Sequence, residues 1–299
     1  MDRAFVENTV ASLGKENAST LLNAIENSEP VVSVRRNSLK LSIDDFREHF
    51  HGNVDGVVLW CQDGIYLKER PSFALDPLFH AGAYYVQEAS SMSVVSVLKA
   101  LNAEGTSLRI LDLCAAPGGK TTAIASAIDG GSLLVANEVI RSRATVLAEN
   151  VSKWGRSNVV VTNSDPADFK KVPGFFDVVF ADVPCSGEGM FRKDSEAVEQ
   201  WSAANVALCS SRQRKIVADA WTSLRPGGYL VYSTCTYNHF ENDDNVAWIA
   251  SELGAQVVDI QIEGAVKTRC GLQFVPGITR GEGFFCALLR KNGDGTHSP

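Results

Sequence analysis

Two cysteines, Cys185 and Cys235, each follow a short apolar run at a position suited to chemistry. Cys185 comes after the run 176–181, behind an aspartate and a proline, and Cys235 comes after the run 229–233, behind a threonine. Short runs rich in Val, Phe and Tyr are typical of buried strands, and open α/β sheets bind ligands outside the carboxyl ends of such strands. A thiol there can be a nucleophile, a base, a metal ligand or a packing residue.

The two thiols would meet at one sheet edge if the strands that precede them are neighbours. Two unbridged thiols beside an electrophile suit methylation of a pyrimidine at carbon-5, which is too weakly nucleophilic to attack a sulfonium methyl group unaided. A thiolate that adds to carbon-6 activates carbon-5, and a base must later remove the carbon-5 proton so that the thiol is eliminated. The pyrimidine must be unstacked to be reached, so we expect a single-stranded or flipped-out nucleotide.

The segment 111–122 predicts a loop that holds a cofactor. It contains the end of an apolar run, the turn Gly118-Gly119 and the start of a helix. Glycines let the backbone approach a ligand closely, and the first amides of the helix point into the same crevice. Gly119-Lys120-Thr121 resembles part of a P-loop, but that motif requires a glycine where Cys114 stands, which argues against a nucleoside triphosphatase.

Three acids follow predicted strands and could serve the same crevice. Glu138, twenty residues after Gly118, could accept hydrogen bonds from both ribose hydroxyls of an adenosine cofactor. Asp165 could hold the adenine amino group or simply form the turn before a proline. Asp182 could stabilise charge at ring nitrogen-3 if protonated, or accept from the cytosine amino group. Because the dinucleotide fingerprint G-x-G-x-x-G is absent, S-adenosylmethionine is favoured over a hydride-transfer cofactor.

From residue 108 onward, strand-like runs alternate regularly with helical patterns, which predicts a parallel sheet with covering helices. Helical patterns are expected at 144–154, at 203–224 and at 242–253, and segments 256–262 and 284–290 could close the sheet as an antiparallel edge pair. The predicted parallel strands are Leu108–Leu113, Leu133–Val139, Val159–Thr162, Val178–Ala181 and Tyr229–Ser233.

The N-terminal third predicts a smaller mixed α/β region with a helix at 18–25. The run 31–40 becomes basic at Arg35, Arg36 and Lys40, which fits either an edge strand with solvated charges or a strip that contacts phosphates. The same two interpretations apply to Arg192 and to the basic residues of the long helix, which are Arg212, Arg214 and Lys215.

The composition of the 299 residues is that of an ordinary globular protein, with 45% hydrophobic and 21% charged residues. Seven scattered cysteines without a C-x-x-C pair argue against a disulfide framework and a zinc site, so no metal is expected. The net charge of −7 argues against non-specific coating of nucleic acid but not against an enzyme with local basic patches. Neither a targeting signal nor an apolar run of membrane-spanning length is recognisable, so we expect a cytoplasmic protein without membrane contact.

Several motifs together resemble the Sun/Nop family of RNA cytosine-5 methyltransferases, and within it the type F group that acts on the bacterial ribosomal small subunit. The resemblance covers about residues 30 to 291, although the type F group commonly continues into a C-terminal RNA-binding extension, and Val183 stands where Ala is usual. It is carried by the segments 112–121, 182–189 and 233–236 with Glu241-Asn242, and is supported by 190–194, Trp201, 279–285, 35–40 and 85–91.

This resemblance implies a Rossmann-like class I sheet that binds S-adenosylmethionine, with a smaller N-terminal α+β RNA-binding domain. It implies that Cys235 is the attacking thiol, that Cys185 promotes product release, and that Asp182 assists at the base. DNA cytosine methyltransferases instead use the Pro-Cys thiol as the nucleophile. The cofactor-binding residues are expected to be Cys114, Ala115, Ala116, Pro117, Gly118, Gly119, Lys120, Glu138, Arg143, Asp165 and Asp182.

The expected organisation is an N-terminal RNA-recognition region at 1–104, a catalytic domain at 105–291 and a flexible tail at 292–299. The expected partner is RNA, most of all 16S rRNA, rather than DNA, and the protein is expected to be a monomer. Transfer RNA is the first alternative substrate. A methyltransferase of the same fold acting on a non-RNA substrate and a non-enzymatic RNA-binding module are the further alternatives.

Overall fold

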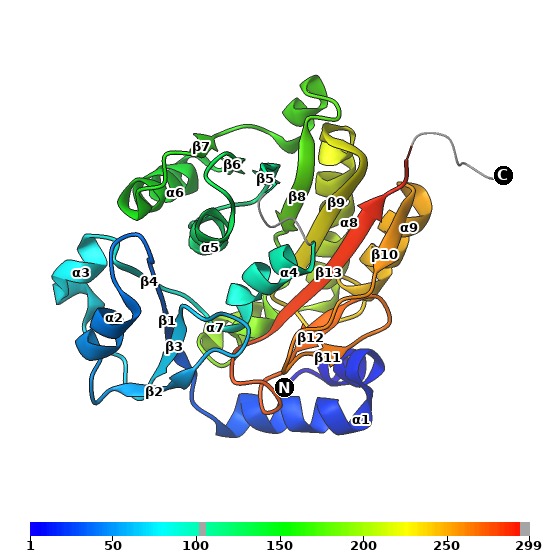
Figure 1. Ribbon diagram of the computed structural model, residues 1–299. Helices are drawn as coiled ribbons and strands as arrows, with labels where there is room; N and C mark the ends of the chain where they lie inside the picture. Colours follow the sequence, from blue (N-terminus) through cyan, green and yellow to red (C-terminus); the bar gives the residue numbers. More distant parts are fainter. Residues whose placement is uncertain (102–105, 294–299) are drawn as a thin grey trace.

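Two β-sheets organise the computed structural model, which describes residues 1–101 and 106–293 (Figure 1). The smaller sheet has four strands in the order β2-β3-β1-β4. The larger sheet has nine, in the order β11-β12-β13-β9-β8-β5-β6-β7, with β10 paired to β13. The predicted domain boundary between 104 and 105 falls outside the described residues, and so do residues 294–299 of the predicted tail. These limits stay predictions.

The small sheet is antiparallel and encloses its own aromatic core. Helices α2 (Ile43–His49) and α3 (Pro77–His80) and the 3-10 turn η1 (Phe73–Leu75) contribute side chains to this core. Its strands are β1 (Val32–Arg36), β2 (Val54–Val57), β3 (Gly64–Leu67) and β4 (Tyr84–Val86).

The first helix, α1 (Arg3–Asn27), is longer than the predicted helix at 18–25 and bends at Gly14, whose φ of 77° lies in the left-handed region. The small sheet with α2, α3 and η1 forms a small unit, and the large sheet with its helices forms a large unit. Helix α1 packs against the large unit, below β11 and β12 in Figure 1. The Phe5 ring lies 5.0 Å from the Phe191 ring and 5.7 Å from the Trp201 ring. Helix α1 and the small sheet therefore pack into different apolar clusters.

The five predicted parallel strands of the large sheet are confirmed, although the last begins at Leu224, five residues before its predicted start at Tyr229. Their spatial order runs β7-β6-β5-β8-β9, so the direction in which strands are added reverses between β5 and β8. A crevice opens at the carboxyl ends of the strands at such a switch point. The strands are β5 (Arg109–Asp112), β6 (Leu133–Asn137), β7 (Val159–Thr162), β8 (Phe176–Asp182) and β9 (Leu224–Thr234).

Helices pack against both faces of the large sheet and form two apolar clusters. One cluster contains side chains of α4 (Val94–Ala100), α5 (Gly119–Ala127) and the end of α6 (Arg141–Trp154). The other contains side chains of α8 (Ala203–Ala220) and α9 (Asp243–Glu252). The shorter helical elements are η2 (Ser90–Ser93), η3 (Pro166–Lys171), η4 (Glu188–Met190), α7 (Ser195–Gln200) and η5 (Trp221–Ser223).

The expected antiparallel pair at the end of the chain forms, but its place in the sheet differs from the prediction. Strand β10 (Ala255–Val258) pairs with β13 (Phe284–Lys291), and β13 also pairs with β9 along six residues. Strand β13 therefore lies inside the sheet, and it is almost continuously apolar because its alternate side chains pack into the two apolar clusters on opposite faces. Two short strands that were not predicted, β11 (Val266–Lys267) and β12 (Leu272–Phe274), extend the sheet beyond it.

Arg35 corrects both interpretations of the basic run, since β1 is a central strand and the Arg35 side chain is 1% exposed. Its guanidinium donates to Gln87 Oε1 at 2.8 Å and to Thr122 Oγ1 at 2.6 Å, and lies 4.5 Å from the Trp154 ring. Burial lowers its pKa to about 10. A buried guanidinium in this position can neither be solvated nor contact a phosphate, and instead joins the small sheet to α5 and α6.

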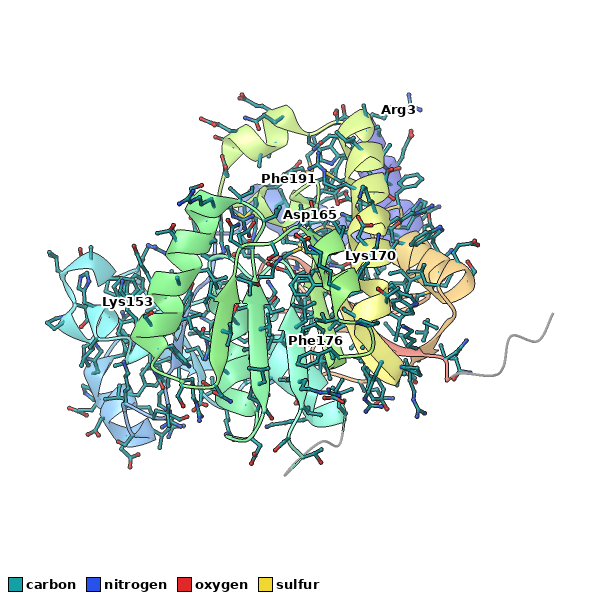
Figure 2. All side chains as sticks on the ribbon, turned by 90° about the horizontal axis from the view of Figure 1, so that it is seen from above. Arg3, Lys153, Asp165, Lys170, Phe176 and Phe191 are labelled. Carbon is teal, nitrogen blue, oxygen red and sulfur yellow. The ribbon has the colours of Figure 1, made fainter. Side chains whose placement is uncertain are left out.

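The neighbouring basic residues also bind protein groups. Arg36 pairs with Asp63 at 2.5 Å, and Lys40 Nζ donates to the carbonyl oxygens of Ala81 and Lys153. In Figure 2, Lys153 lies where the small unit meets the large one. Arg35 and Lys40 therefore dock the two units on each other, whereas Arg36 binds within the small unit.

Replacing Arg35 with methionine is expected to reduce the free energy of unfolding by about 2–4 kcal/mol, because buried acceptors on α5 would lose their donor. Urea denaturation of wild type and R35M measures the loss. Arg3 is a matched control, since its pair with Glu7 is solvated and R3M is expected to change stability by less than about 0.5 kcal/mol. Equal effects of both variants would contradict a docking role for Arg35.

Candidate active site

The two predicted cysteines meet above neighbouring parallel strands. Asp182 at the end of β8 is in register with Ser233 near the end of β9, and the loops that follow bring Cys185 Sγ to 3.1 Å from Cys235 Sγ. Both thiols are free and partly buried. The hypothesis that the two cysteines share one sheet edge is therefore confirmed in its geometry, while their roles remain proposals.

The surroundings of Cys185 favour the protonated form of its thiol. The hydrogen bond with Cys235 and burial raise the pKa of Cys185 well above its usual value, and the Glu241 carboxylate adds to this shift. A thiol in this environment keeps its proton. The arrangement favours Cys185 as the S–H donor and Cys235 as the acceptor of the contact.

Lys120 and Asp182 form an ion pair beside the thiols. Lys120 Nζ lies 2.8 Å from Asp182 Oδ2, and Ser233 Oγ donates to Asp182 Oδ1 at 2.8 Å. Burial alone would lower the pKa of Lys120, but the attraction of Asp182 outweighs it and the pKa is raised. Of the two options for Asp182, the pairing favours a carboxylate that accepts hydrogen bonds over a protonated acid.

The predicted cofactor loop lines a cavity of about 190 Å³ at the switch point between β5 and β8. Most of the predicted contact residues surround it, namely Cys114, Ala115, Ala116, Pro117, Gly119, Lys120 and Asp182. The other side consists of residues from the small unit and its link, which had no predicted contact role: Tyr85, Val86, Gln87, Glu88 and Ser91. This link therefore closes the cavity as well as joining the units.

Asp112 is a further acid at this cavity, to which the sequence analysis assigned no role. It ends β5 and is 1% exposed, and Thr121 Oγ1 donates to its Oδ2 at 2.6 Å. Burial raises the pKa of Asp112 to about 7, and burial also raises the pKa of the adjacent Cys114 thiol. Its place at the end of a strand, like that of Glu138 and Asp182, is the signal that could have identified it.

Glu138 directly follows β6, and one of its carboxylate oxygens has no hydrogen-bond donor within the part of the chain that the structure describes. The carboxylate is 2% exposed, and its Oε1 accepts from the Ile140 amide. Arg143 lies 3.2 Å from Oε2, yet this oxygen accepts no hydrogen bond from the described residues. Arg143 also donates to the Ala116 carbonyl at 2.9 Å, so it links Glu138 to the cofactor loop. A buried acceptor without a donor fits a ligand hydroxyl.

Four predicted contact residues do not line the cavity, namely Gly118, Glu138, Arg143 and Asp165. Asp165 caps the turn η3 through its Oδ1, which accepts from the Ala167 amide at 2.9 Å, so the turn-forming contact is present and its contact with adenine stays a prediction. Figure 2 shows it at the carboxyl edge of the sheet, whereas Phe176 begins β8 at the opposite edge. Gly118 has a φ of 112° at the start of α5 and does not line the cavity.

Arg192 corrects a further interpretation, since it is neither on a solvated face nor free to bind phosphate. Its Nε donates to Glu282 Oε2 at 2.8 Å, and the two side chains are 6% and 4% exposed. Arg192 also donates to the Ser28 hydroxyl and the Gly281 carbonyl. The residue therefore joins the end of α1 to the segment before β13.

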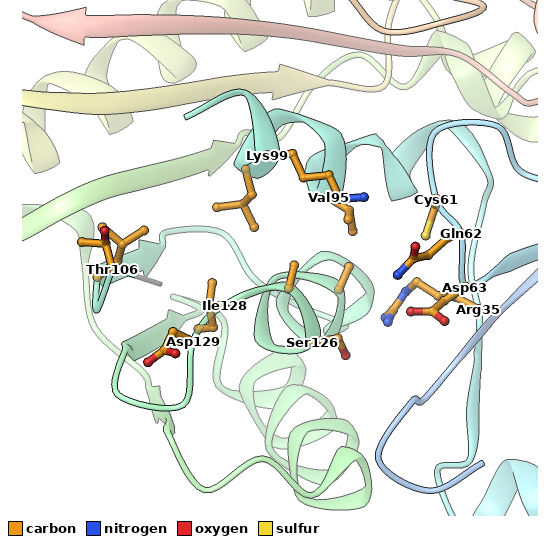
Figure 3. Close-up of a pocket in the computed structure, with 14 residues that line it drawn as sticks. Arg35, Cys61, Gln62, Asp63, Val95, Lys99, Thr106, Ser126, Ile128 and Asp129 are labelled. Atoms are coloured by element: carbon orange, nitrogen blue, oxygen red, sulfur yellow. The ribbon is translucent and has the colours of Figure 1, made fainter. Parts of the chain in front are cut away.

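Another cavity, of about 390 Å³, lies between α4 and α5 and is unrelated to the predicted chemistry (Figure 3). Arg35, Cys61 and Asp63 lie at one end of it and Asp129 at the other. None of the residues predicted to react or to bind the cofactor lines it. The smaller cavity beside Lys120 and Asp182 is therefore the candidate active site.

Two buried carboxylates near the thiols, Glu188 and Glu241, also had no predicted role. They are 1% and 0% exposed and accept hydrogen bonds from the loops that carry the cysteines. They stood within the motifs of the family resemblance, but their partners lie about fifty positions away along the chain.

Comparison with known families identifies the chain. The family described as 16S rRNA methyltransferase RsmB/F matches residues 97–290, and the N-terminal domain of 16S rRNA methyltransferase RsmF matches residues 1–89. The chain belongs to the RsmB/F family. The predicted resemblance to the type F group is thereby confirmed.

Curated relatives of the RsmB/F chain agree with this assignment. The ribosomal RNA small subunit methyltransferase F of Pectobacterium atrosepticum is 38% identical over 276 residues, which is 87% of this chain and 56% of that protein. The Escherichia coli protein of the same name is 40% identical over 275 residues, which is 87% of this chain and 57% of that protein. The chain therefore spans a little over half the length of the relatives it matches.

Solved structures confirm the expected Rossmann-like methyltransferase fold. A methyltransferase homologue from Pyrococcus horikoshii is 26% identical, with a TM-score of 0.79 and coverage of 97% of this chain and 95% of that one. NSun6 from the same organism, crystallised with SFG, is 21% identical with a TM-score of 0.82 and coverage of 98% and 99%. S-adenosylmethionine, the predicted cofactor, is confirmed for this family and fold. No helix of residues 1–101 and 106–293 has the length and apolarity needed to cross a membrane.

Proposed function

We propose that the chain transfers a methyl group from S-adenosylmethionine to carbon-5 of a cytosine in RNA, through a covalent bond between Cys235 and carbon-6. The observation that carries this proposal is the 3.1 Å contact between Cys185 and Cys235 beside Lys120 and Asp182. Methyl transfer to most nucleophiles needs no thiol, whereas carbon-5 chemistry needs one to activate the ring and a proton-transfer step to release it.

The raised pKa of the Cys185 thiol supports Cys235 as the nucleophile. Cys185 keeps its proton and can donate to Cys235, which stabilises the thiolate form of Cys235. The Cys235 thiolate adds to carbon-6, and the electron pair displaced from the carbon-5–carbon-6 double bond becomes available at carbon-5. After methyl transfer, a base from solvent takes the carbon-5 proton, the electron pair of that bond restores the carbon-5–carbon-6 double bond, and Cys235 leaves carbon-6 as a thiolate. Cys185 lies within reach of the departing sulfur and can assist the release by donating its S–H hydrogen bond.

Asp182 is suited to hold the target base. As a carboxylate paired with Lys120, it can accept a hydrogen bond from the cytosine 4-amino group, while Lys120 neutralises charge that develops near ring nitrogen-3. A uracil presents a carbonyl at that position, which a carboxylate would repel. The ion pair between Lys120 and Asp182 therefore favours cytosine over uracil as the target base.

The residues that line the cavity, together with Glu138 beside it, fit the cofactor. The Glu138 oxygen that lacks a donor suits a ribose hydroxyl, and the loop 114–119 presents backbone groups and small side chains to the rest of the ligand. The bound cofactor would supply the electrophilic methyl group. The chain contributes orientation and keeps the reacting atoms within one crevice between β5 and β8.

Ribosomal RNA is the proposed substrate because the relatives are named as ribosomal small-subunit methyltransferases and because a type F N-terminal domain precedes the catalytic unit. The test is transfer of tritium from labelled S-adenosylmethionine to 16S rRNA, to 30S subunits and to transfer RNA, followed by bisulfite sequencing. We expect 5-methylcytosine at a defined position of the ribosomal RNA. Labelling of transfer RNA alone would correct the substrate, and labelling of no RNA would refute the function.

A further inference from the structure

Two short segments carry the thiols, and each one holds the other through a buried carboxylate. The Cys185 segment (183–189) contains Glu188, and the Cys235 segment (235–242) contains Glu241. We propose that Glu188 and Glu241 are positioning residues that form a crossed clamp. In it, Glu188 fixes Cys235 for attack and Glu241 fixes Cys185 for release. The assignment of the two steps rests on the proposed function.

Glu188 holds the start of the Cys235 segment. Its Oε2 accepts from the Thr236 hydroxyl at 2.5 Å and from the Tyr237 and Asn238 amides at 2.7 and 3.1 Å. These donors follow Cys235 directly in the chain. They leave the Cys235 backbone little freedom relative to the Cys185 segment, and the Gly189 amide adds a bond to the Cys235 carbonyl at 2.8 Å.

Gly189 must be a glycine for this contact. A Cβ at Gly189 would lie 2.9 Å from the Cys235 carbonyl oxygen and 2.9 Å from the Gly283 carbonyl oxygen, both of which are backbone atoms that cannot rotate away. The two cysteine segments thus approach each other as closely as their backbones allow.

Glu241 acts in the opposite direction, on the Cys185 segment. Its Oε2 accepts from the Ser186 amide at 3.0 Å and from Gln213 Nε2 at 2.7 Å. Gln213 also donates to the Pro184 carbonyl at 2.9 Å, so both neighbours of Cys185 are tied to Glu241, one directly and one through Gln213. The Asn238 side chain donates to both Glu188 and Glu241 and joins the two halves of the clamp.

The chemistry of the clamp requires carboxylates. Trp201 Nε1 is a further donor to Glu188, so every partner of its two oxygens donates a hydrogen bond, and most are amides that cannot accept one. No ion pair is formed by Glu188 or Glu241 within residues 1–101 and 106–293. A glutamine would place an NH₂ group against these donors and force the segments apart. A displacement of about 1 Å of a reacting group can cost about a hundredfold in rate.

The two halves of the clamp predict different defects. E188Q is expected to slow formation of the Cys235–RNA adduct about ten- to a hundredfold without accumulation of adduct. E241Q is expected to lose less rate in adduct formation than E188Q, to turn over about ten- to a hundredfold more slowly than wild type, and to accumulate adduct. Single-turnover reactions with 16S rRNA, quenched and resolved on denaturing gels, separate these cases, and a general loss of stability would not produce the split.

Asp243 provides the matched control. It is a buried carboxylate two residues beyond Glu241, and the hydrogen bonds that its side chain accepts come from the Thr268 hydroxyl and the Cys270 amide, outside both cysteine segments. D243N is expected to react like wild type at temperatures below its melting point. Should the glutamine variants not fold, E188D and E241D take their place in the same reactions. The shorter aspartate keeps the charge but moves the carboxylate oxygens away from their donors. The same gel pattern for both clamp variants, or for either variant and D243N, would overturn the proposal.

Alkylation by iodoacetamide, followed by mass spectrometry, provides a readout without RNA. E188Q is expected to change the rate at Cys235 by at least about threefold, and E241Q the rate at Cys185, because each thiol would leave its fixed environment. Unchanged rates at both thiols would refute the clamp. If the wild-type chain labels no RNA while the alkylation rates shift as expected, the proposed function fails and the clamp stands.

Discussion

Replacing Cys235 with alanine is expected to lower methyl transfer to RNA by at least about 1,000-fold, whereas C185A is expected to remain covalently attached to its RNA. The reason is that the two thiols serve consecutive steps. Without Cys235 no bond to carbon-6 forms and carbon-5 stays unreactive, while without Cys185 the adduct forms and its release is impaired. Denaturing gels of each variant incubated with labelled RNA and S-adenosylmethionine measure both outcomes.

The 3.1 Å sulfur contact makes this experiment a direct test of which thiol attacks, because both sulfurs lie within reach of the same base. An RNA adduct that accumulates with C235A and is absent with C185A would reverse the assignment. C270A is the control, since Cys270 is a partly buried free thiol outside the candidate site and its loss is expected to leave turnover unchanged. Binding of S-adenosylmethionine, measured by calorimetry, should be unaltered in all three variants.

The parallel part of the sheet could be predicted from the sequence because each of its strands is a short apolar run between turn signals. The place of Cys185 and Cys235 followed from this pattern, since parallel strands present their carboxyl ends at one edge. The two-residue strand β11 and the three-residue strand β12 gave no such signal, because their runs are too short to show a period.

Charged residues were predicted less well, because their partners are distant in sequence. Arg35 binds Thr122, 87 positions away, and Arg192 binds Glu282, 90 positions away. A local pattern contains no information on such pairs, so each arginine was given the surface role that is usual for its type. Glu188 and Glu241 were left without a role for the same physical reason, although they stand beside the catalytic motifs.

Asp182→Asn is expected to reduce kcat for RNA methylation about 100-fold or more while the Kd of S-adenosylmethionine changes much less. The carboxylate would no longer neutralise Lys120, and the amide offers a weaker acceptor to the cytosine amino group. D177N is the matched control, because Asp177 lies at the other end of β8 and pairs with Arg109 and Arg225 at the opposite sheet edge. This variant is expected to lose stability without loss of kcat, and an equal kcat for D182N and D177N would contradict the role of Asp182.

The pH dependence of stability gives D182N a second signature. In the wild type the ion pair raises the pKa of Lys120 above its usual value of 10.5, so the pair stabilises the folded state fully below pH 10.5 and loses its effect as the pH rises through the folded pKa. D182N is therefore expected to be about 1–3 kcal/mol less stable than wild type at pH 8, since one charge of a partly buried pair is left uncompensated. The difference should shrink as the pH rises toward the raised pKa of Lys120 in the folded wild type, because in D182N burial without Asp182 lowers the pKa of Lys120 and the variant loses its uncompensated charge first. Melting temperatures of both proteins from pH 7 to pH 11 measure this convergence, and a difference that stays constant to pH 11 would show that Asp182 stabilises the fold by contacts other than its charge on Lys120.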